Sequence, residues 1–323
     1  MNKPNHASPR LPKPLSTGSR IAVVAPSSPA LDGGLERGLG ALRGMGFVPV
    51  VGHSCLEHEP KRGYLAGRSD AVKIDDIHWA FSDPSIDGVV CLRGGSGAGR
   101  LVRHLDAALI AANPKVFVGY SDITILHCYI ARNCGFVTFH GPMLSNDPLD
   151  ILASPERASF LRVLTDPAPL GAFRNPPGFG ELACLVPGRA EGELVGGNLA
   201  VLATTLGTCA EVDTAGKIVL LEDVDEEPYS VDRLLAHLLN AGKLSDAAGI
   251  VLGDFTKCEP PERYPDRSVQ DVIEDLLVPL GIPILAGLRV GHGGVNMTLP
   301  LGVRTGLDAE KLVLRFDEPA ISA

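Results

Sequence analysis

The segment Pro114-Lys-Val-Phe-Val-Gly-Tyr-Ser-Asp-Ile-Thr124 changes from a strand pattern to a helix pattern within a few residues. Val116 to Val118 form a short β-branched and aromatic run, typical of a buried strand, and Gly119 allows the backbone to turn tightly. From Asp122 to Arg132 the apolar residues have helical spacing. Ser121 is therefore predicted to lie on a strand-to-helix turn, with its hydroxyl at the carboxyl edge of a sheet.

A serine on such a turn has two interpretations. The N–H groups that begin a helix have no intrahelical partner, so they can hold a developing oxyanion beside Ser121, as in a nucleophile elbow. Alternatively, Ser121 or Asp122 only caps the helix, which is the commoner role of these residue types at a helix start. The local pattern alone does not separate the two.

The composition limits the classes of protein that need to be considered. A length of 323 residues predicts about two domains, and 45% hydrophobic with 21% charged residues is typical of soluble globular proteins. The net charge of −9 argues against nucleic acid or an anionic membrane as the main partner, and no apolar run approaches the ~20 residues of a membrane span. Residues 1–19 lack the apolar centre of a signal peptide, so we expect a flexible arm and a cytoplasmic protein.

Strand and helix patterns alternate over residues 20–145, which predicts a parallel sheet covered by helices on both faces. Residues 146–189 are rich in Pro and Gly and are interpreted as a connector with one helix at 154–164, and residues 190–323 form a second domain. The strands expected are 20–26, 47–51, 88–92, 116–118, 136–139, 217–222, 249–253 and 311–316, and the other helices 31–45, 70–81, 99–111, 122–132, 198–206, 230–241 and 269–277.

A glycine-rich loop, Leu92-Arg-Gly-Gly-Ser-Gly-Ala-Gly-Arg100, follows one of these strands. It fits neither a Walker A motif, because Arg100-Leu101 stands where Lys-Ser/Thr is needed, nor the dinucleotide pattern G-x-G-x-x-G. Its exposed backbone N–H groups suit an oxyanion hole, with Gly95 as donor beside the N–H of Asp122. A glycine-rich turn without any function is the alternative.

Three further groups stand at the ends of apolar runs. Glu222 closes the run from Ile218 and is costly to bury without a partner, whereas the acids after it are interpreted as a solvated loop. His292 lies between glycines that leave its ring reachable. His140, in Phe139-His-Gly-Pro142, is a rival general base or a turn residue, and His127 is expected to pack within the fold.

Serine, glutamate and histidine in this chain order can fill the roles of nucleophile, orienting acid and general base. The sequence spacing does not show that they meet, since the separations are long. Two other classes remain: a non-catalytic or sugar-binding α/β protein in which Ser121 is a cap, and an α/β-hydrolase esterase, which is disfavoured because Ile123 stands where G-x-S-x-G needs its second glycine.

Several segments taken together resemble the LD-carboxypeptidases, serine peptidases of the muramoyl-tetrapeptide carboxypeptidase type. The resemblance covers about residues 20–316. The motifs that carry it, in chain order, are Arg93-Gly-Gly-Ser-Gly-Ala-Gly99, Asn113-Pro-Lys-Val-Phe-Val-Gly-Tyr-Ser-Asp-Ile-Thr124, Phe139-His-Gly-Pro142, Gly196-Gly-Asn-Leu199, Leu221-Glu222 and Gly291-His-Gly-Gly-Val-Asn-Met-Thr-Leu-Pro-Leu-Gly302.

The resemblance implies that Ser121 is the nucleophile, Glu222 the orienting acid and His292 the general base. It also implies an oxyanion hole formed by the N–H of Asp122 and of a glycine in the Arg93 loop. The residues Arg93, Gly94 and Ser96 are expected to contact substrate, Ser96 replacing the family's usual aromatic residue. The implied fold is α/β: an N-terminal flavodoxin-like parallel sheet and a C-terminal domain built around a small barrel-like sheet, paired as a homodimer.

The activity that the resemblance implies is hydrolysis of the bond between an L-centre and the terminal D-alanine of a peptidoglycan tetrapeptide, without a cofactor. The competitor is the microcin-immunity branch, which cleaves peptidyl- and aminoacyl-nucleotides and should carry an aromatic residue for base stacking. The connector holds Phe160, Phe173 and Phe179 but no tryptophan, which favours the tetrapeptide. Metal ligation is not expected, and His53-Ser-Cys-Leu-Glu-His58 is interpreted as a chance cluster.

Overall fold

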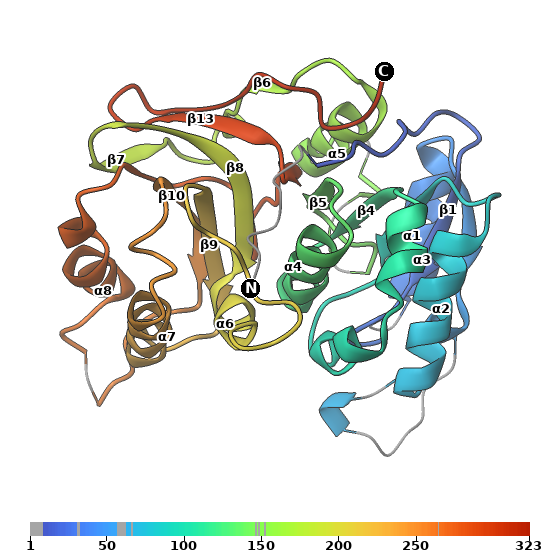
Figure 1. Cartoon of the computed structure of the whole chain (residues 1–323), viewed down its shortest axis with the longest axis horizontal. Coiled ribbons are helices and arrows are strands. Elements are labelled where there is room, and N and C mark those ends of the chain that lie inside the picture. The colour runs from blue at the N-terminus through green and yellow to red at the C-terminus, as the bar shows by residue number, and fades with distance from the viewer. Residues whose placement is uncertain are drawn as a thin grey trace.

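The structure is a computed structural model that describes residues 9–30, 33–56, 63–65, 67–145, 147, 149–151, 153–263 and 265–323. Two α/β halves lie side by side, each built around its own sheet (Figure 1). The strands of the first sheet are β1 (Arg20–Val24), β2 (Val48–Val51), β3 (Gly88–Cys91), β4 (Val116–Gly119), β5 (Thr138–His140) and β12 (Leu299–Leu301).

The first sheet has the strand order β12-β5-β4-β3-β1-β2, and its strands β1 to β5 run parallel. Without β12 this is the 2-1-3-4-5 order of flavodoxin, which confirms the predicted N-terminal architecture. Strand β12 pairs antiparallel with β5, although it comes from the segment assigned to the second domain. The chain therefore returns to the first sheet before it ends.

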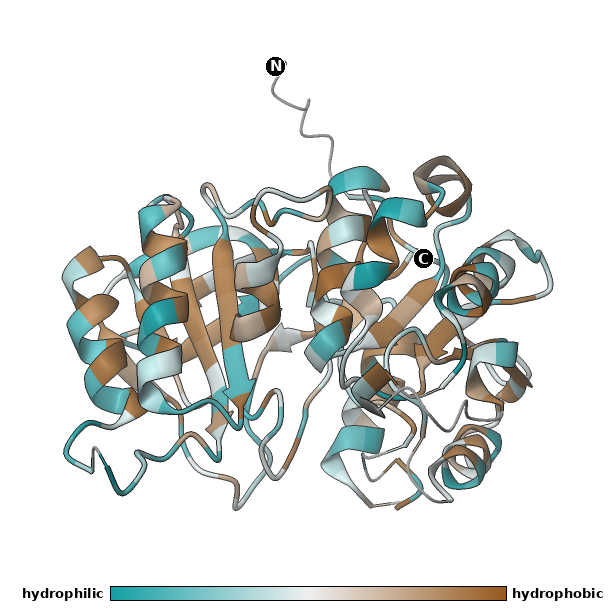
Figure 2. Cartoon of the chain, turned by 90° about the horizontal axis from the view of Figure 1, so that it is seen from below, coloured by the Kyte–Doolittle hydropathy of each residue, from teal (hydrophilic) through white to brown (hydrophobic). Residues whose placement is uncertain are grey.

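Helices cover both faces of the first sheet, as the alternating pattern predicted. On one face, alternate strand residues such as Ala22 and Phe117 pack with helices α2 (Asp70–Ser82), α3 (Ala107–Ala112) and α4 (Thr124–Asn133). On the other, their neighbours pack with α1 (Gly34–Gly44) and α5 (Pro155–Thr165). Figure 2 shows the strands as the hydrophobic interior of both halves.

The second sheet has the order β6-β14-β13-β8-β9-β10-β11-β7. Its strands are β6 (Gly171–Ala172), β7 (Ala183–Val186), β8 (Arg189–Asn198), β9 (Ile218–Val224), β10 (Gly249–Thr256), β11 (Ile284–Ala286), β13 (Arg304–Asp308) and β14 (Val313–Phe316). Strands β8 to β11 are parallel, and the remaining pairings are antiparallel.

Strand β8 divides its pairing between two neighbours. Residues 189–193 pair with β13 and residues 194–198 pair with β9. The apolar residues of β13 and β14 thereby join one face of the parallel strands, and α6 (Leu199–Thr204), α7 (Pro228–Asn240) and α8 (Val269–Leu276) cover the other. This is the α/β domain that the resemblance implied.

Some predicted elements differ from the observed ones. The single helix expected over 99–111 is two short 3₁₀ turns, Ala98–Arg100 and Val102–His104, followed by α3, which begins where Asp106 accepts a hydrogen bond from the N–H of Leu109. Strands β6, β7, β8, β11, β12 and β13 were not predicted, and β6 and β7 lie in the segment interpreted as a connector. Tyr264, in the loop after β10, lies outside the described residues.

Residues 9–19 pack against the first domain, so the expectation of a flexible arm is wrong for this part of residues 1–19. Leu15 is 2% exposed, and its N–H donates to the carbonyl of Leu164. Arg10 forms a parallel bridge with Phe136. Residues 1–8 lie outside the described residues. Among the helices that the structure describes, none combines the length and apolar character needed to cross a membrane.

Candidate active site

Ser121 lies on the turn between β4 and α4, where the sequence placed it. Its φ is 62°, a left-handed conformation that among the described non-glycine residues is shared only by Asp225, Lys257 and Leu312. Such a conformation costs on the order of 1–3 kcal/mol and is concentrated at functional sites. The interpretation of Ser121 or Asp122 as a simple cap is not supported, because the N-cap of α4 is Ile123 and no side chain bonds to that helix start.

A buried histidine, His127, stabilises this turn through hydrogen bonds. His127 is 2% exposed, its Nε2 donates to the carbonyl of Gly119 at 2.9 Å, and its Nδ1 accepts from the hydroxyl of Thr138 at 2.9 Å. Burial lowers the pKa of His127 to about 4, so the ring stays neutral. It packs within the fold, as predicted.

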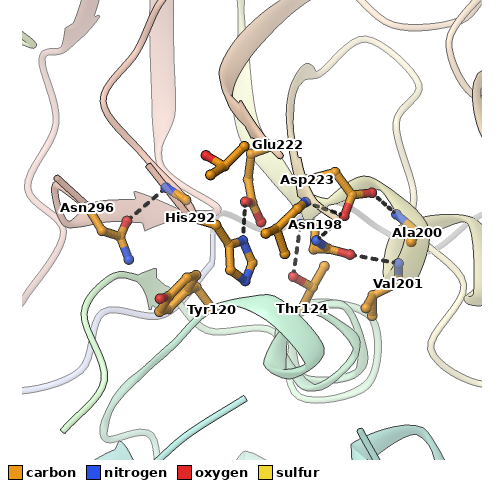
Figure 3. A network of polar contacts seen from close by, with 12 residues as sticks. Tyr120, Thr124, Asn198, Ala200, Val201, Glu222, Asp223, His292 and Asn296 are labelled. Atoms are coloured by element: carbon orange, nitrogen blue, oxygen red, sulfur yellow. Dashed lines mark hydrogen bonds and ion pairs between the residues drawn. The ribbon is translucent and has the colours of Figure 1, made fainter. Parts of the chain in front are cut away.

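Glu222 and His292 form a buried pair in the second domain. Glu222 lies on β9 and is 0% exposed, and its Oε2 is 2.7 Å from Nδ1 of His292 (Figure 3). A carboxylate on Nδ1 fixes the tautomer that leaves Nε2 for a reacting group. The sequence-predicted acid and base are therefore brought together.

The first domain contacts this pair through the residue directly before Ser121. The ring of Tyr120 lies 4.9 Å from the ring of His292, centroid to centroid, with an interplanar angle of 54° (Figure 3). The hydroxyl of Tyr120 donates to Asp147 at 3.4 Å. The nucleophile turn and the histidine thus meet at the boundary between the domains.

Charge and burial act in opposite directions on His292. Burial by itself lowers its pKa, but the hydrogen bond and the negative charge of Glu222, with smaller contributions from Asp223 and Asp147, leave the pKa raised above its ordinary value. A base with a raised pKa holds an accepted proton more firmly.

The glycines around His292 have a different role from the one inferred from the sequence. A Cβ on Gly291 would run into the Glu222 carboxylate, and a Cβ on Gly293 would run into Asp254, which is itself paired with Arg289. These glycines give room for the Glu222 and Asp254 carboxylates rather than merely exposing the ring. The N–H of Gly291 also donates to Oδ1 of Asn296 at 2.9 Å, which pins the loop (Figure 3).

Asp223, interpreted from the sequence as part of a solvated loop, is 2% exposed. Its carboxylate accepts from Nδ2 of Asn198 at 2.8 Å and from the N–H of Ala200 at 2.9 Å, and burial raises its pKa to about 6. The N–H of Asn198 donates in turn to Oγ1 of Thr124 at 3.1 Å (Figure 3). This chain of bonds joins the helix behind Ser121 to the strand that carries Glu222.

The glycine loop lies against the nucleophile, and the glycine that packs on Ser121 is Gly94 rather than Gly95. A Cβ on Gly94 would lie 2.7 Å from Cβ and 2.9 Å from Oγ of Ser121. Gly95, the predicted oxyanion donor, has a φ of 109°, and its α-carbon faces Ser28. Of the other residues expected to contact substrate, Arg93 donates to the carbonyl of Pro29 at 3.3 Å and the N–H of Ser96 donates to Oγ of Ser28 at 3.2 Å.

His140, the rival base, is 0% exposed and has no hydrogen-bond partner on either ring nitrogen among the described residues. Burial, with smaller electrostatic contributions from the neighbouring His127 and His292, holds its pKa well below the ordinary range. Its ring lies 5.7 Å from that of Tyr120. Because no carboxylate orients it and solvent does not reach it, His292 is the better placed base.

The sequence reasoning missed Asp147 as well as Asp223. Asp147 accepts from the N–H of Met143 at 2.7 Å, and burial raises its pKa to about 7. Tyr120 was quoted within the Ser121 segment without a role. No local sequence pattern distinguishes these two acids from surface acids.

The part of the chain that the structure describes contains no group of three or more His, Cys, Asp or Glu side chains suited to a metal ion. In the His53 cluster, the N–H of His53 donates to Asp76 at 3.1 Å, while His58 lies outside the described residues.

Comparison with known proteins places this arrangement in a family. The family model of the LD-carboxypeptidase N-terminal domain matches residues 21–141, and the model of the LD-carboxypeptidase C-terminal domain matches residues 191–307. The chain is 42% identical over 302 residues to a probable murein peptide carboxypeptidase of Bacillus subtilis (strain 168), which covers 93% of this chain and 92% of the relative.

Two solved structures have the same fold. The muramoyltetrapeptide carboxypeptidase from Oxalobacter formigenes superposes with a TM-score of 0.78 at 30% identity, over 92% of this chain and 97% of that one. The microcin C7 self immunity protein MccF in its wild-type apo state superposes with a TM-score of 0.87 at 25% identity, over 97% and 100%. Fold and matches together define a two-domain α/β hydrolase of the serine peptidase class. The chain belongs to the LD-carboxypeptidase family.

Proposed function

We propose that this chain is a serine carboxypeptidase that removes the terminal D-alanine from peptidoglycan tetrapeptides by cleaving the L,D-peptide bond, with Ser121, Glu222 and His292 as its catalytic triad. The observation that carries the proposal is the buried Glu222–His292 pair, 2.7 Å apart, in ring contact with the residue before a left-handed serine. The similarity to a probable murein peptide carboxypeptidase and to a muramoyltetrapeptide carboxypeptidase supports the substrate class.

In the acylation step, Nε2 of His292 takes the proton of the Ser121 hydroxyl while Oγ attacks the carbonyl carbon of the L-residue. Glu222 stabilises the imidazolium through Nδ1, 2.7 Å away. The tetrahedral intermediate then collapses, and the imidazolium gives its proton to the leaving amine of D-alanine. An acyl-enzyme ester on Ser121 remains.

The oxyanion of this intermediate needs donors on the side of the glycine loop. Asp122 is the second residue of the 3₁₀ turn Ser121–Ile123, so its N–H has no acceptor within that turn. We assign this N–H and that of Gly95 to the oxyanion hole, with Arg93, Gly94 and Ser96 contacting substrate. A water molecule, deprotonated by His292, then hydrolyses the ester and frees Ser121.

The direct test is to incubate the protein with a tetrapeptide ending in D-alanine and to detect free D-alanine by mass. A peptide of the same sequence ending in L-alanine is the matched control, since only the stereochemistry of the leaving residue differs. Release of D-alanine that is absent with the L-alanine peptide is expected. No release from the D-alanine peptide would refute the proposed substrate.

A second candidate is hydrolysis of peptidyl- or aminoacyl-nucleotides, which the likeness to the microcin C7 self immunity protein favours. Of the connector aromatics, Phe160 and Phe173 are buried, and Phe179 is 37% exposed. Only Phe179 among these three is therefore accessible for stacking on a base. Competition between a tetrapeptide and an aminoacyl-nucleotide, read as the ratio of kcat/KM values, decides between the two, and a ratio that favours the nucleotide would overturn our preference.

Activity is expected to survive strong chelators, because the proposed steps use only Ser121, His292, Glu222 and backbone donors. The measurement is D-alanine release before and after prolonged dialysis against EDTA. Loss of activity that zinc restores, and that magnesium does not, would contradict this expectation.

The pH profile of kcat/KM is expected to report His292. A general base must be neutral, so activity should rise with pH as His292 loses its proton, and the midpoint should lie above the ordinary histidine value because Glu222 raises the pKa. Glu222→Gln should move the midpoint to lower pH. Glu274→Gln, on α8 and far along the chain from the pair, is the control that should leave it unchanged. A midpoint that does not respond to Glu222→Gln would contradict the assignment.

We further propose that the protein is a cytoplasmic homodimer, as the family resemblance implies. Sedimentation equilibrium at several concentrations tests the assembly. A monomer at all concentrations would refute it.

A further inference from the structure

The carboxylate of Asp122 is bonded to two segments far from it in sequence. Asp122 follows Ser121 directly, yet its Oδ2 accepts from Oγ of Ser27 at 2.6 Å and from the N–H of Ala98 at 2.8 Å. Ser27 belongs to the loop after β1, and Ala98 lies in the glycine loop after β3, where it begins a 3₁₀ turn. One oxygen thus joins the nucleophile turn to both neighbouring loops.

These two loops are also bonded to each other. The N–H of Ser28 donates to the carbonyl of Gly94 at 3.1 Å, and Oγ of Ser28 accepts from the N–H of Ser96 at 3.2 Å. Nζ of Lys73, which is 3% exposed, also donates to the carbonyl of Ser27. The loop after β1 therefore packs against the glycine loop and is hydrogen-bonded to it.

The position of the glycine loop matters because of what it touches. A Cβ on Gly94 would lie 2.9 Å from Oγ of Ser121, so the backbone of Gly94 packs closely against the nucleophile and leaves no room for a side chain. Oxyanion donors act only when they lie about 2.7–3.1 Å from the developing charge. Gly94, Gly95 and Gly97 are free to adopt many conformations, so bonds elsewhere must hold them.

We propose that the Asp122 side chain is a positioning residue that clamps the glycine loop against Ser121 and so sets the geometry of the oxyanion hole. The inference rests on the proposed function and deepens it, because it assigns the carboxylate a task separate from that of the backbone N–H of the same residue. Burial raises the pKa of Asp122, opposed by the bonds from Ser27 and Ala98, by the charge of Lys73 and by a backbone hydrogen bond from Gly97. The Ser27 and Ala98 donors use the same oxygen, so an amide oxygen can replace it in these two bonds.

The test compares Asp122→Ala with Asp122→Asn. Removing the clamp should lower kcat by about 10²–10³-fold, the cost of losing one oxyanion donor, with little change in KM. Asp122→Asn should restore most of that rate. Ser27→Ala, which removes one of the two bonds, should give a smaller loss of kcat and remains informative if Asp122→Ala does not fold.

The matched control is Asp106→Ala. Asp106 lies in the same domain and accepts a backbone N–H at 3.0 Å, but as the cap of α3, away from the glycine loop. It should lower stability without lowering kcat. Asp122→Ala and Ser27→Ala variants that both keep the wild-type kcat would overturn the proposal, as would an Asp122→Asn variant no better than Asp122→Ala.

A second measurement tests the role of the Asp122 side chain independently of which substrate the enzyme cleaves. The rate at which a fluorophosphonate labels Ser121 depends on the base and the oxyanion hole, not on a tetrapeptide. If the wild type labels but releases no D-alanine, the proposed substrate is wrong, and the labelling rates of the variants still test the clamp. Equal labelling rates for the wild type, Asp122→Ala and Ser27→Ala would refute it.

Discussion

Ser121→Ala is expected to lower kcat by about 10⁴–10⁶-fold, as in other serine triads, while the protein keeps its fold. The catalytic loss follows from the absence of Oγ, since no other group takes the place of the nucleophile. The fold should persist because alanine has the same Cβ as serine and meets the same backbone constraint at a φ of 62°. The measurements are the rate of D-alanine release and thermal unfolding.

Two further variants sharpen this result. Ser82→Ala, at the exposed end of α2, removes a hydroxyl of the same kind and should leave kcat unchanged. Ser121→Gly should be as inactive as Ser121→Ala but without the cost of a left-handed side chain, on the order of 1 kcal/mol. Near-normal turnover by Ser121→Ala would refute the mechanism.

The first sheet could be predicted because its strands are continuous apolar runs. Buried parallel strands need no alternation, and Gly88 to Cys91 or Val116 to Gly119 are recognisable from composition alone. The second sheet was only partly predictable. Strand β8, Arg-Ala-Glu-Gly-Glu-Leu-Val-Gly-Gly-Asn, contains charges and glycines, and its pairing with β9 and β13 decides its conformation. The two residues of β6 exist as a strand only through β14.

The residues of the candidate site also divide into those that the local sequence reveals and those that only the folded structure reveals. Ser121, Glu222 and His292 each stand at or near the end of an apolar run, a signal that lies in the local sequence and that the family resemblance joined into one site. Asp223 and Asp147 carry no such signal. Asp223 accepts bonds from Asn198 and the start of α6, and Asp147 accepts a bond from the hydroxyl of Tyr120, and only the folded structure reveals these partners.

His292→Ala is expected to lower kcat by about 10⁴–10⁶-fold as well, because the serine then has no base. Unlike Ser121→Ala, it should also lower stability. Glu222 is 0% exposed, and its other oxygen, Oε1, has no hydrogen-bond partner among the described residues. Loss of His292 leaves this carboxylate buried and unpaired, which costs about 3–5 kcal/mol for a broken buried pair.

The loss of stability in His292→Ala can arise either from the unpaired charge of Glu222 or from lost packing of the His292 ring, and a double variant tells the two causes apart. If the loss arises from the unpaired charge of Glu222, the double variant His292→Ala/Glu222→Gln should regain much of the free energy of unfolding and none of the activity. Denaturant unfolding of both variants and the wild type at neutral pH measures this, with Glu222→Gln alone as the control. A double variant as unstable as His292→Ala would assign the loss to packing instead. A double variant with restored turnover would remove His292 from the mechanism, because a group that only balances the charge of Glu222 is dispensable once that charge is gone.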